Sequence, residues 1–332
     1  MPERLRLTHR LALGDTLLMT SLVRDIHRAY PGRFAIEPNT TWTPVWQHNP
    51  HITTFETDAR PEPRNVVISY AEGIVESGRG RKIHMLAWFH EDFRRKTGLE
   101  VPVTEAGGDL HLSAAERAPR LEGRYWLVLS GGKLDLTAKW WAAERFQQTV
   151  DILSRYGLRF AQVGATHSAH VHPPLRGVTN LIGQTDDVRD LFSLIAGADG
   201  VLCGVTGAMH IAAALRRPCV VVAGGREEPW WEAYTAAYGG FGLACPPPAV
   251  PHRYLHTLGL LDCCPVKGCW KSRVVPIMAE DHTAKGKRRL CGNVVRPTGG
   301  QVVPRCLDMV SVDHAVEAVL SYYADGTLPT LR

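Results

Sequence analysis

The feature of the sequence that most constrains the fold is a regular alternation of strand-like and helix-like segments between residues 125 and 223. Short apolar runs typical of buried strands are each followed, after a short loop, by a longer segment with apolar residues at helical spacing. The expected strands are 125–129, 159–163, 200–204 and 219–223, and the expected helices are 142–156, 186–198 and 208–215. This order predicts a parallel, doubly wound α/β sheet.

A second unit of the same kind precedes it. A strand at 5–8 leads through a glycine-bearing loop into a helix that begins near Asp15 and ends at Pro31. In this helix the apolar residues recur every four positions, whereas Arg24 and Asp25 occupy the other face. The alternation continues with expected strands at 34–37 and 65–69 and an expected helix at 84–96. The N-terminal part is therefore also predicted to be α/β with a parallel sheet.

The length of 332 residues suits two domains of ordinary size. We expect the linker in 101–124, which is poor in long apolar runs. The predicted fold has two Rossmann-like doubly wound domains, at 1–120 and 121–332. A segment at about 245–306, dense in Pro, Gly and Cys, interrupts the second as an irregular insertion, and an amphipathic helix at 312–323 closes the chain.

Composition indicates a globular protein, with 45% apolar and 21% charged residues. The N-terminus lacks the apolar run of a signal peptide, and no window approaches 18 uninterrupted apolar residues. We therefore expect a soluble, cytoplasmic protein without a membrane span. The net charge of +5 includes two basic stretches, Arg79 to Lys96 and Lys285 to Arg289. These stretches either form a solvent-exposed face or attract a polyanion. Because no nucleic-acid-binding pattern of interleaved aromatic residues accompanies them, nucleic acid is not the favoured partner.

Ligands of open α/β sheets bind beyond the carboxyl ends of the strands, so three loops are informative. The first contains Gly14, where the backbone can approach a ligand closely, and Asp15 at a helix start. Asp15 is either a helix cap or a general base. The second contains Ser130, Gly131 and Lys133 and leads to Lys139 at the entrance to a helix. It is either a phosphate cradle or a surface loop.

The third loop is again a strand, a turn of small residues and a helix. Free backbone N–H groups at the start of such a helix favour a diphosphate. It is neither a Walker loop nor a G-x-G-x-x-G fingerprint, which disfavours an ATPase or a dehydrogenase. The residues expected to bind the phosphates or to lie beside them are Thr206, Gly207, Ala208, Met209 and His210.

The cysteines are unevenly placed. Five of the eight lie within one stretch of 44 residues. In a chain without a secretion signal this crowding favours a metal over disulfides, and four thiolates suit tetrahedral zinc or iron. Unliganded thiols are the alternative. The expected ligands of this structural metal are drawn from Cys263, Cys264, Cys269, Cys291 and Cys306.

Two longer runs are distinctive, LALGDTLLMTSLVRDIHRAYP and NLIGQTDDVRDLFSLIAGADGVLCGVTGAMHIAAALRRPCVVVAGG. Both resemble a known family, the glycosyltransferase family 9 heptosyltransferases. The first is similar to the family's N-terminal motif and the second to its donor-binding half. The cysteine segment, with CCPVKGCWKSR and PRCLDM, resembles that of the bacterial autotransporter heptosyltransferases, which implies a structural iron site and a protein acceptor.

The resemblance implies a GT-B fold and inverting transfer of a sugar, without a catalytic metal. By resemblance the donor is an ADP-sugar, the sugar is heptose, and the acceptor is a hydroxyl of a glycan or a protein. Asp15 matches the general base, and Lys139 matches the phosphate-binding lysine. Thr206 and Gly207 match the turn at the diphosphate. Val205 departs from the family, which usually has an aspartate there that contacts the donor sugar.

Other functions remain open at the level of sequence. A nucleotide-sugar epimerase or hydrolase would turn over the donor without an acceptor. A non-catalytic scaffold would bind a partner through the cysteine segment and keep only a vestigial donor cleft. A phage-type DNA-modifying glycosyltransferase would use the basic stretches. Homo-oligomer formation is also left open by the sequence.

Overall fold

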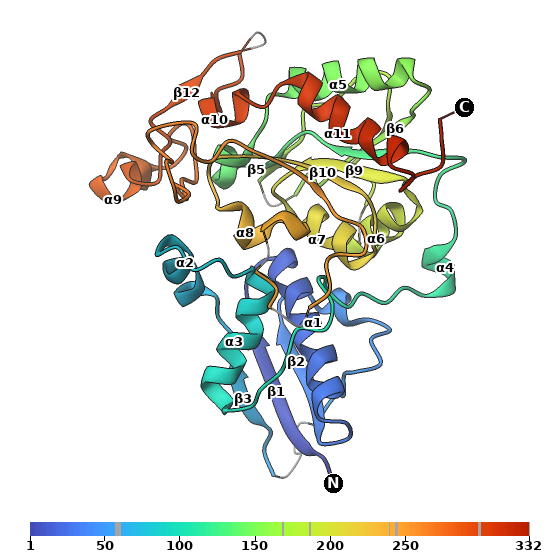
Figure 1. The fold of residues 1–332 in the computed structure, drawn as a ribbon, viewed down its shortest axis with the longest axis vertical. Helices are drawn as coiled ribbons and strands as arrows, with labels where there is room; N and C mark the ends of the chain where they lie inside the picture. Colours follow the sequence, from blue (N-terminus) through green and yellow to red (C-terminus); the bar gives the residue numbers. More distant parts are fainter. Residues whose placement is uncertain are drawn as a thin grey trace.

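The computed structural model describes residues 1–56, 61–167, 169–185, 187–238, 240–242, 245–297 and 300–331. Its two parallel sheets lie in two lobes, the N-terminal one below and the C-terminal one above in Figure 1. The protein is thus α/β with parallel sheets, as predicted. The first sheet ends at Val67 and the second begins at Trp126, so the two sheets lie on either side of the expected boundary near residue 120.

The N-terminal sheet has the strand order β2-β1-β3, and both neighbours of β1 pair with it in parallel. Alternate residues of β1, such as Leu5 and Leu7, are buried, because one face of the strand packs on the core. The described elements of this lobe are β1 (Glu3–His9), α1 (Leu13–Ala29), β2 (Phe34–Thr40), η1 (Thr43–Trp46), β3 (Arg64–Val67), α2 (Ala71–Gly78) and α3 (Met85–Thr97). The connecting segment contains α4 (Ala114–Arg117), whose Glu116 pairs with Arg189 of the C-terminal lobe.

The C-terminal sheet has six parallel strands in the order β11-β10-β9-β4-β6-β8. Helices cover both faces: Leu127 and Leu129 of β4 belong to the core cluster of α6 and α7, whereas Trp126 and Val128 belong to that of α5 and α11. The elements are β4 (Trp126–Leu129), α5 (Ala143–Arg155), β6 (Phe160–Gly164), β8 (Thr179–Ile182), α6 (Val188–Gly197), β9 (Gly200–Gly204), α7 (Gly207–Ala214), β10 (Cys219–Gly224), α8 (Pro229–Glu232), β11 (Arg253–His256) and α11 (Val312–Ala324).

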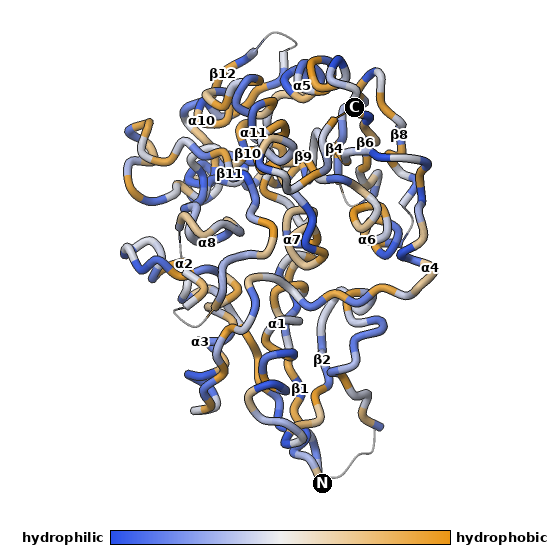
Figure 2. Tube along the Cα trace, turned by 45° about the vertical axis from the view of Figure 1, so that its right-hand side comes forward, coloured by the Kyte–Doolittle hydropathy of each residue, from blue (hydrophilic) through white to orange (hydrophobic). Residues whose placement is uncertain are grey.

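Short elements surround this sheet. Figure 2 shows the apolar residues concentrated on the strands and inner helices such as α7. None of the helices in the described ranges is long and apolar enough to cross a membrane. The short elements are β5 (Gly132–Lys133), η2 (Leu134–Lys139), β7 (His170–Val171), η3 (Ala236–Tyr238), η4 (Ala279–His282), α9 (Ala284–Lys287), β12 (Val294–Val295), β13 (Val303–Pro304) and α10 (Arg305–Asp308).

One sequence-based boundary is wrong. The segment from about 245 to 306 was expected to be an irregular insertion, but β11 lies within it and pairs in parallel with β10. The strand has only four residues, and Tyr254 alone of them is buried, so its pattern is too short to stand out among prolines and glycines. The irregular part therefore begins after His256.

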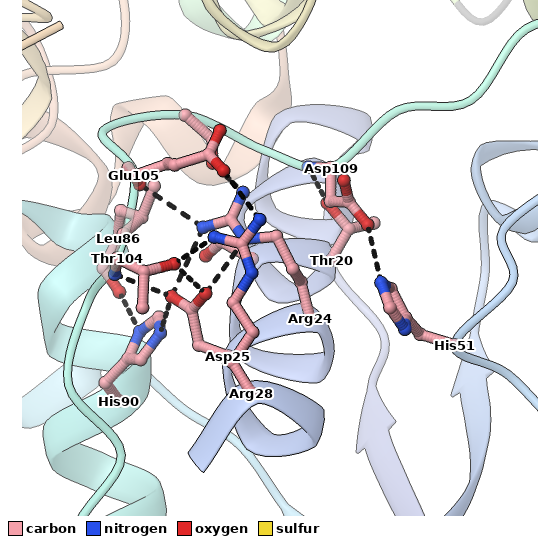
Figure 3. A network of polar contacts seen from close by, with 12 residues as sticks. Thr20, Arg24, Asp25, Arg28, His51, Leu86, His90, Thr104, Glu105 and Asp109 are labelled. Atoms are coloured by element: carbon pink, nitrogen blue, oxygen red, sulfur yellow. Dashed lines mark hydrogen bonds and ion pairs between the residues drawn. The ribbon is translucent and has the colours of Figure 1, made fainter. Parts of the chain in front are cut away.

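The two lobes meet where α1 faces α7. A Cβ at Gly14 would lie 2.6 Å from the imidazole of His210, so only glycine permits this approach. A separate polar network joins α1, α3 and the connecting segment (Figure 3). Its centre is the buried Asp25, which accepts hydrogen bonds from Arg24 of the same helix, His90 of α3 and Thr104 of the connecting segment. Segment 101–109 therefore covers the polar face of α1.

Candidate active site

Asp15 lies in the first turn of α1, at the carboxyl end of the N-terminal sheet. Its Oδ2 accepts a hydrogen bond of 2.9 Å from the backbone N–H of Ala12, so the side chain does cap the helix. The residue is 9% exposed. Burial raises the pKa of Asp15, against the opposing effects of the Ala12 hydrogen bond and of the nearby His9 and Lys139. A carboxylate with a raised pKa is a better proton acceptor than an ordinary aspartate.

Lys139 comes from the other lobe, at the end of η2. Its Nζ lies 2.7 Å from Oε1 of Glu227, which also pairs with Arg226. Burial alone would raise the pKa of Glu227, but Arg226 and Lys139 together hold it below its usual value. Glu227 is thus a buried carboxylate shared by two cations.

Asp15 and Lys139 come from different lobes and are close enough to interact electrostatically. The positive charge of Lys139 lowers the pKa of Asp15. The sequence predicted each residue separately from its loop, and the folded chain brings both to the same region. A proton acceptor and a cation in that arrangement can serve a hydroxyl group on one side and a departing anion on the other.

The turn from Val205 to His210 lies at the end of β9 and opens α7. Thr206 occupies the helix cap position without making a capping hydrogen bond, and its buried Oγ1 has no partner in the described fold. The side chains of Ala208 and Met209 point into the core, so this turn can contribute to a ligand site mainly through its backbone and Thr206. The Nδ1 atom of His210 and the hydroxyl group of Tyr234 form a hydrogen bond. Burial, and to a smaller extent the positive charge of Lys139, lowers the pKa of His210 to about 3.

The loop at 130–133 is committed to internal contacts. The hydroxyl of Ser130 lies 2.9 Å from the carbonyl oxygen of Pro173 and also accepts from Gln162. A Cβ at Gly131 would lie 2.0 Å from a carbonyl oxygen of Val171. Lys133 is exposed in β5, which pairs with β7. The predicted donor-binding residues of this loop therefore lie beside the antiparallel pair of β5 and β7. The hydroxyl group of Ser130 is occupied by its hydrogen bonds with Pro173 and Gln162.

Sequence reasoning missed two residues beside Asp15 and Lys139. Glu232, at the end of α8, is 6% exposed and interacts with Asp15, Lys139 and Glu227. Burial, followed by the charge of Glu227, raises its pKa to about 8. Tyr70, directly before α2, has its pKa raised well above its usual value by burial and then by the charges of Asp15, Glu232 and Glu227. The acidic run in GREEPWWE was the available signal for Glu232.

The two tryptophans of α8 hold this helix against the N-terminal lobe. Trp231 is buried in the core and lies edge-on to the ring of Tyr70, with 6.3 Å between the centroids. The indole N–H of Trp230 donates to the hydroxyl of Ser77 at 2.9 Å. α8 is therefore positioned by contacts with the lobe that carries Asp15.

The polar residues of α3 have structural partners. His90 contacts Asp25, Glu91 pairs with Arg94 and Arg95, and Asp92 pairs with Lys96. His84, just before α3, is stacked on Phe241 in the core. A cavity of about 660 Å³ lies beside α3, with His90 and Glu91 among its lining residues, but neither Asp15 nor Lys139 lines it.

The five clustered cysteines share one region of the C-terminal lobe. Burial raises the pKa of Cys264 to about 12, with further contributions from Cys263 and Cys306. Cys291 and Cys263 both contact Asn293. Across the described ranges, however, no group of three or more His, Cys, Asp or Glu residues is arranged so that it could hold a metal ion. The predicted cysteines are neighbours, but this structure does not arrange them as a metal centre.

A model of glycosyltransferase family 9 (heptosyltransferase) matches residues 69–250, more than half of the chain, and this match defines the protein as an enzyme that transfers sugars. The protein is a glycosyltransferase and belongs to family 9. No curated protein matches the sequence.

Solved structures have the same fold at low identity. A family 9 glycosyl transferase from Veillonella parvula is 12% identical, with 96% of each chain covered and a TM-score of 0.57. ADP-heptose lps heptosyltransferase II of E. coli is 14% identical over 98% of this chain and 100% of that chain, with a TM-score of 0.55. The iron-containing dodecameric glycosyltransferase TibC from enterotoxigenic E. coli is 15% identical over 99% of this chain and 78% of its own, with a TM-score of 0.62.

Proposed function

We propose that the protein is an inverting heptosyltransferase that moves heptose from ADP-heptose to a hydroxyl group of a glycan or protein acceptor. The observation that carries the proposal is the pair formed by Asp15 and Lys139, which belong to different lobes and interact electrostatically. Family membership makes an ADP-sugar the natural donor, and TibC has been solved in complex with ADP-D-beta-D-heptose.

In this mechanism the acceptor lies on the side of the N-terminal lobe. Asp15 takes the proton of the acceptor hydroxyl as its oxygen attacks the anomeric carbon of heptose. The bond from that carbon to the β-phosphate oxygen breaks, and ADP leaves with the electron pair. Attack from the face opposite the leaving group inverts the anomeric configuration.

The negative charge that grows on the departing diphosphate is met by the C-terminal lobe. Lys139 supplies a cation, and the start of α7 at Thr206 and Gly207 supplies backbone N–H groups and the positive end of a helix dipole. The buried and unpartnered hydroxyl of Thr206 is a further donor for a phosphate oxygen. No metal is required for this step.

Release of ADP from ADP-heptose by the purified protein tests the proposal. Release that requires an added glycan or protein hydroxyl is the expected result. Release at the same rate in water alone would identify a hydrolase, and absence of any nucleotide-sugar binding would identify a scaffold. Use of a UDP- or GDP-sugar, with no ADP-sugar accepted, would contradict the proposed donor. Transfer of the sugar to DNA would identify a DNA-modifying enzyme.

We further propose that the five-cysteine cluster binds one structural zinc or iron ion. Thiolates are ligands that both metals accept, and TibC is described as iron-containing. The spacing of the thiols does not fit a metal centre as the structure stands. Binding would therefore draw the sulfur atoms of this irregular segment together, and no step of the sugar transfer depends on it.

A further inference from the structure

We propose that Glu232 determines specificity for the donor by forming a hydrogen bond with a hydroxyl group of the transferred sugar. The inference rests on the proposed function and deepens it, because it names the group that distinguishes the sugar from the rest of the donor. Neither the order of the loops nor the family's motifs assigns a role to this residue.

The position of Glu232 is the first argument. In the proposed reaction Asp15 lies on the acceptor side of the anomeric carbon, and Lys139 lies on the diphosphate side. The sugar must therefore lie between these two residues. Glu232 ends α8, the helix whose Trp231 ring lies 6.3 Å from that of Tyr70 in the N-terminal lobe and which begins just after Glu227, the ion-pair partner of Lys139 at 2.7 Å. The charges of Asp15 and Lys139 both act on its carboxyl group. A side chain in that position is next to the sugar ring.

The second argument is the unused hydrogen-bonding capacity of Glu232. Its Oε2 is buried and has no partner in the described fold. Among the residues that the structure describes, Lys139 and Arg226 both form their ion pairs with Glu227, and no ion pair involves Glu232. A buried polar atom without a partner costs about 1–3 kcal/mol, and a ligand hydroxyl that reaches this atom removes that cost.

The neighbouring side chains leave this role open. Val205, which precedes the phosphate-binding turn, is buried and has no hydrogen-bonding group in its side chain. Gly14 has no side chain at all. Thr206 lies at the start of α7, where it faces the diphosphate in the proposed mechanism. Glu227 also has a buried oxygen without a partner in the described fold, but its carboxylate is held by Lys139 and Arg226. Glu232 is thus a carboxyl group that is available for a sugar hydroxyl beside Asp15.

The charge state of Glu232 suits an anionic donor. With its pKa raised to about 8 by burial and by Glu227, the side chain is neutral near pH 7. A neutral carboxylic acid both donates and accepts hydrogen bonds, and it does not repel the diphosphate. The contacts of Trp230 and Trp231 with the N-terminal lobe hold α8, and with it Glu232, in a fixed position.

The test compares the affinities for ADP-heptose and for ADP, measured by titration calorimetry without acceptor. In Glu232→Leu we expect the dissociation constant of ADP-heptose to rise by about 10-fold or more, because one hydrogen-bond partner is lost, while that of ADP changes by less than about 3-fold. Glu122→Leu is the matched control, since Glu122 is exposed, and it should change neither constant. If Glu232→Leu raised both dissociation constants by the same factor, or raised neither, the proposal would be overturned.

A second measurement uses wild-type protein and therefore does not depend on the folding of the leucine variant. Ionisation of Glu232 above pH 8 removes its donor, so the affinity for ADP-heptose should fall relative to that for ADP between pH 7 and 9. In Glu232→Gln, whose side chain cannot ionise, the ratio of the affinities for ADP-heptose and ADP should stay nearly constant over this pH range. A ratio that is constant with pH in the wild type would contradict the role of Glu232. Failure of the wild type to bind either ligand would instead contradict the proposed function.

Discussion

Lys139 and Glu227 form an ion pair of 2.7 Å that holds the proposed phosphate-binding cation before any donor arrives. The carboxylate is 2% exposed and the lysine side chain 18% exposed, so the pair is largely shielded from solvent. A diphosphate that binds Lys139 must either replace Glu227 or share the cation with it. This competition makes Glu227 a determinant of donor affinity.

The first prediction concerns Glu227→Gln. Removal of its negative charge frees Lys139 and Arg226 and lessens repulsion of the diphosphate, so we expect ADP to bind about 3- to 10-fold more tightly. Calorimetric titration with ADP measures the change.

Lys139→Ala is the matched comparison, and it should weaken ADP binding by about 10-fold or more because a charge-assisted hydrogen bond is lost. Weaker ADP binding in Glu227→Gln would mean that Glu227 orients Lys139 for the phosphates and does not compete with them.

The second prediction separates the two roles of Asp15. In Asp15→Asn the side-chain oxygen can still accept the hydrogen bond from Ala12, so the melting temperature should change little. The amide cannot take a proton, and transfer of heptose should fall by about 100-fold or more at nearly unchanged ADP affinity. Asp15→Ala removes both functions and should lower the melting temperature as well. Turnover above half of the wild-type value in Asp15→Asn would leave only the capping role.

Much of the fold could be predicted because the local signals agree with the tertiary structure. The helix expected at 142–156 is α5, Ala143–Arg155, and the strand expected at 200–204 is β9, with the same bounds. Both have the apolar pattern that their burial demands. β11 was missed because its position in the sheet depends on pairing with β10, and four residues next to prolines contain too little pattern to reveal it.

Residues of the proposed site could be named from the sequence only where they lie in a recognisable loop. Asp15 and Lys139 follow such loops, whereas Glu232 becomes relevant only when α8 packs against the other lobe. The interpretation of Arg24 and Asp25 as the polar face of a helix was correct locally, yet both are buried. Segment 101–109 covers them, and helical periodicity cannot indicate that a distant segment will do so.

The third prediction concerns stability and pH. The folded-state pKa of Glu232 is about 8, above the usual glutamate value, so the folded protein retains a proton that the unfolded chain releases. Stability should therefore fall as the pH rises from about 5 to 8. The titratable or charged groups that interact with Glu232 are Asp15, Glu227, Lys139, Arg226, Tyr70, Tyr234, Tyr254 and, through its backbone, His84.

Thermal unfolding between pH 5 and 8 provides the measurement. Glu232→Gln should lose less stability over this interval than the wild type, because the glutamine releases no proton on unfolding. Glu122→Gln, at an exposed position, should behave like the wild type. Identical pH profiles for the wild type and Glu232→Gln would show that Glu232 is ionised in the folded protein.

The fourth prediction is a metal content of about one zinc or iron ion per chain in protein purified without chelators. Cys269→Ser should lower both the metal content and the melting temperature, because a structural metal contributes its binding energy to folding. Cys245→Ser removes a thiol outside the five-cysteine cluster and serves as the control. Less than about a tenth of an equivalent of zinc plus iron in the wild type would contradict metal binding.

The fifth prediction concerns Asp25, which joins α1, α3 and the connecting segment (Figure 3). Its carboxylate is fully buried and accepts hydrogen bonds from Arg24 at 2.8 Å and from Thr104 at 2.5 Å. Burial alone would raise the pKa of Asp25, but hydrogen bonds from His90 and Arg24 hold it far below the usual value. A depressed pKa contributes stability above the pKa of the unfolded chain, and this contribution is lost as the pH falls below about 4.

Asp25→Asn leaves the shape of the side chain but removes its charge, so the buried guanidinium of Arg24 loses its counter-ion. Breaking such a pair costs about 3–5 kcal/mol, which denaturant unfolding at pH 7 would measure. Asp313→Asn changes an exposed aspartate and should stay within about 0.5 kcal/mol of the wild type. Between pH 5 and 3 the wild type should lose more stability than Asp25→Asn, since only the wild type must protonate this carboxylate on unfolding. Parallel acid profiles, or a loss of less than about 1 kcal/mol at pH 7, would mean that the network does not hold the connecting segment on α1.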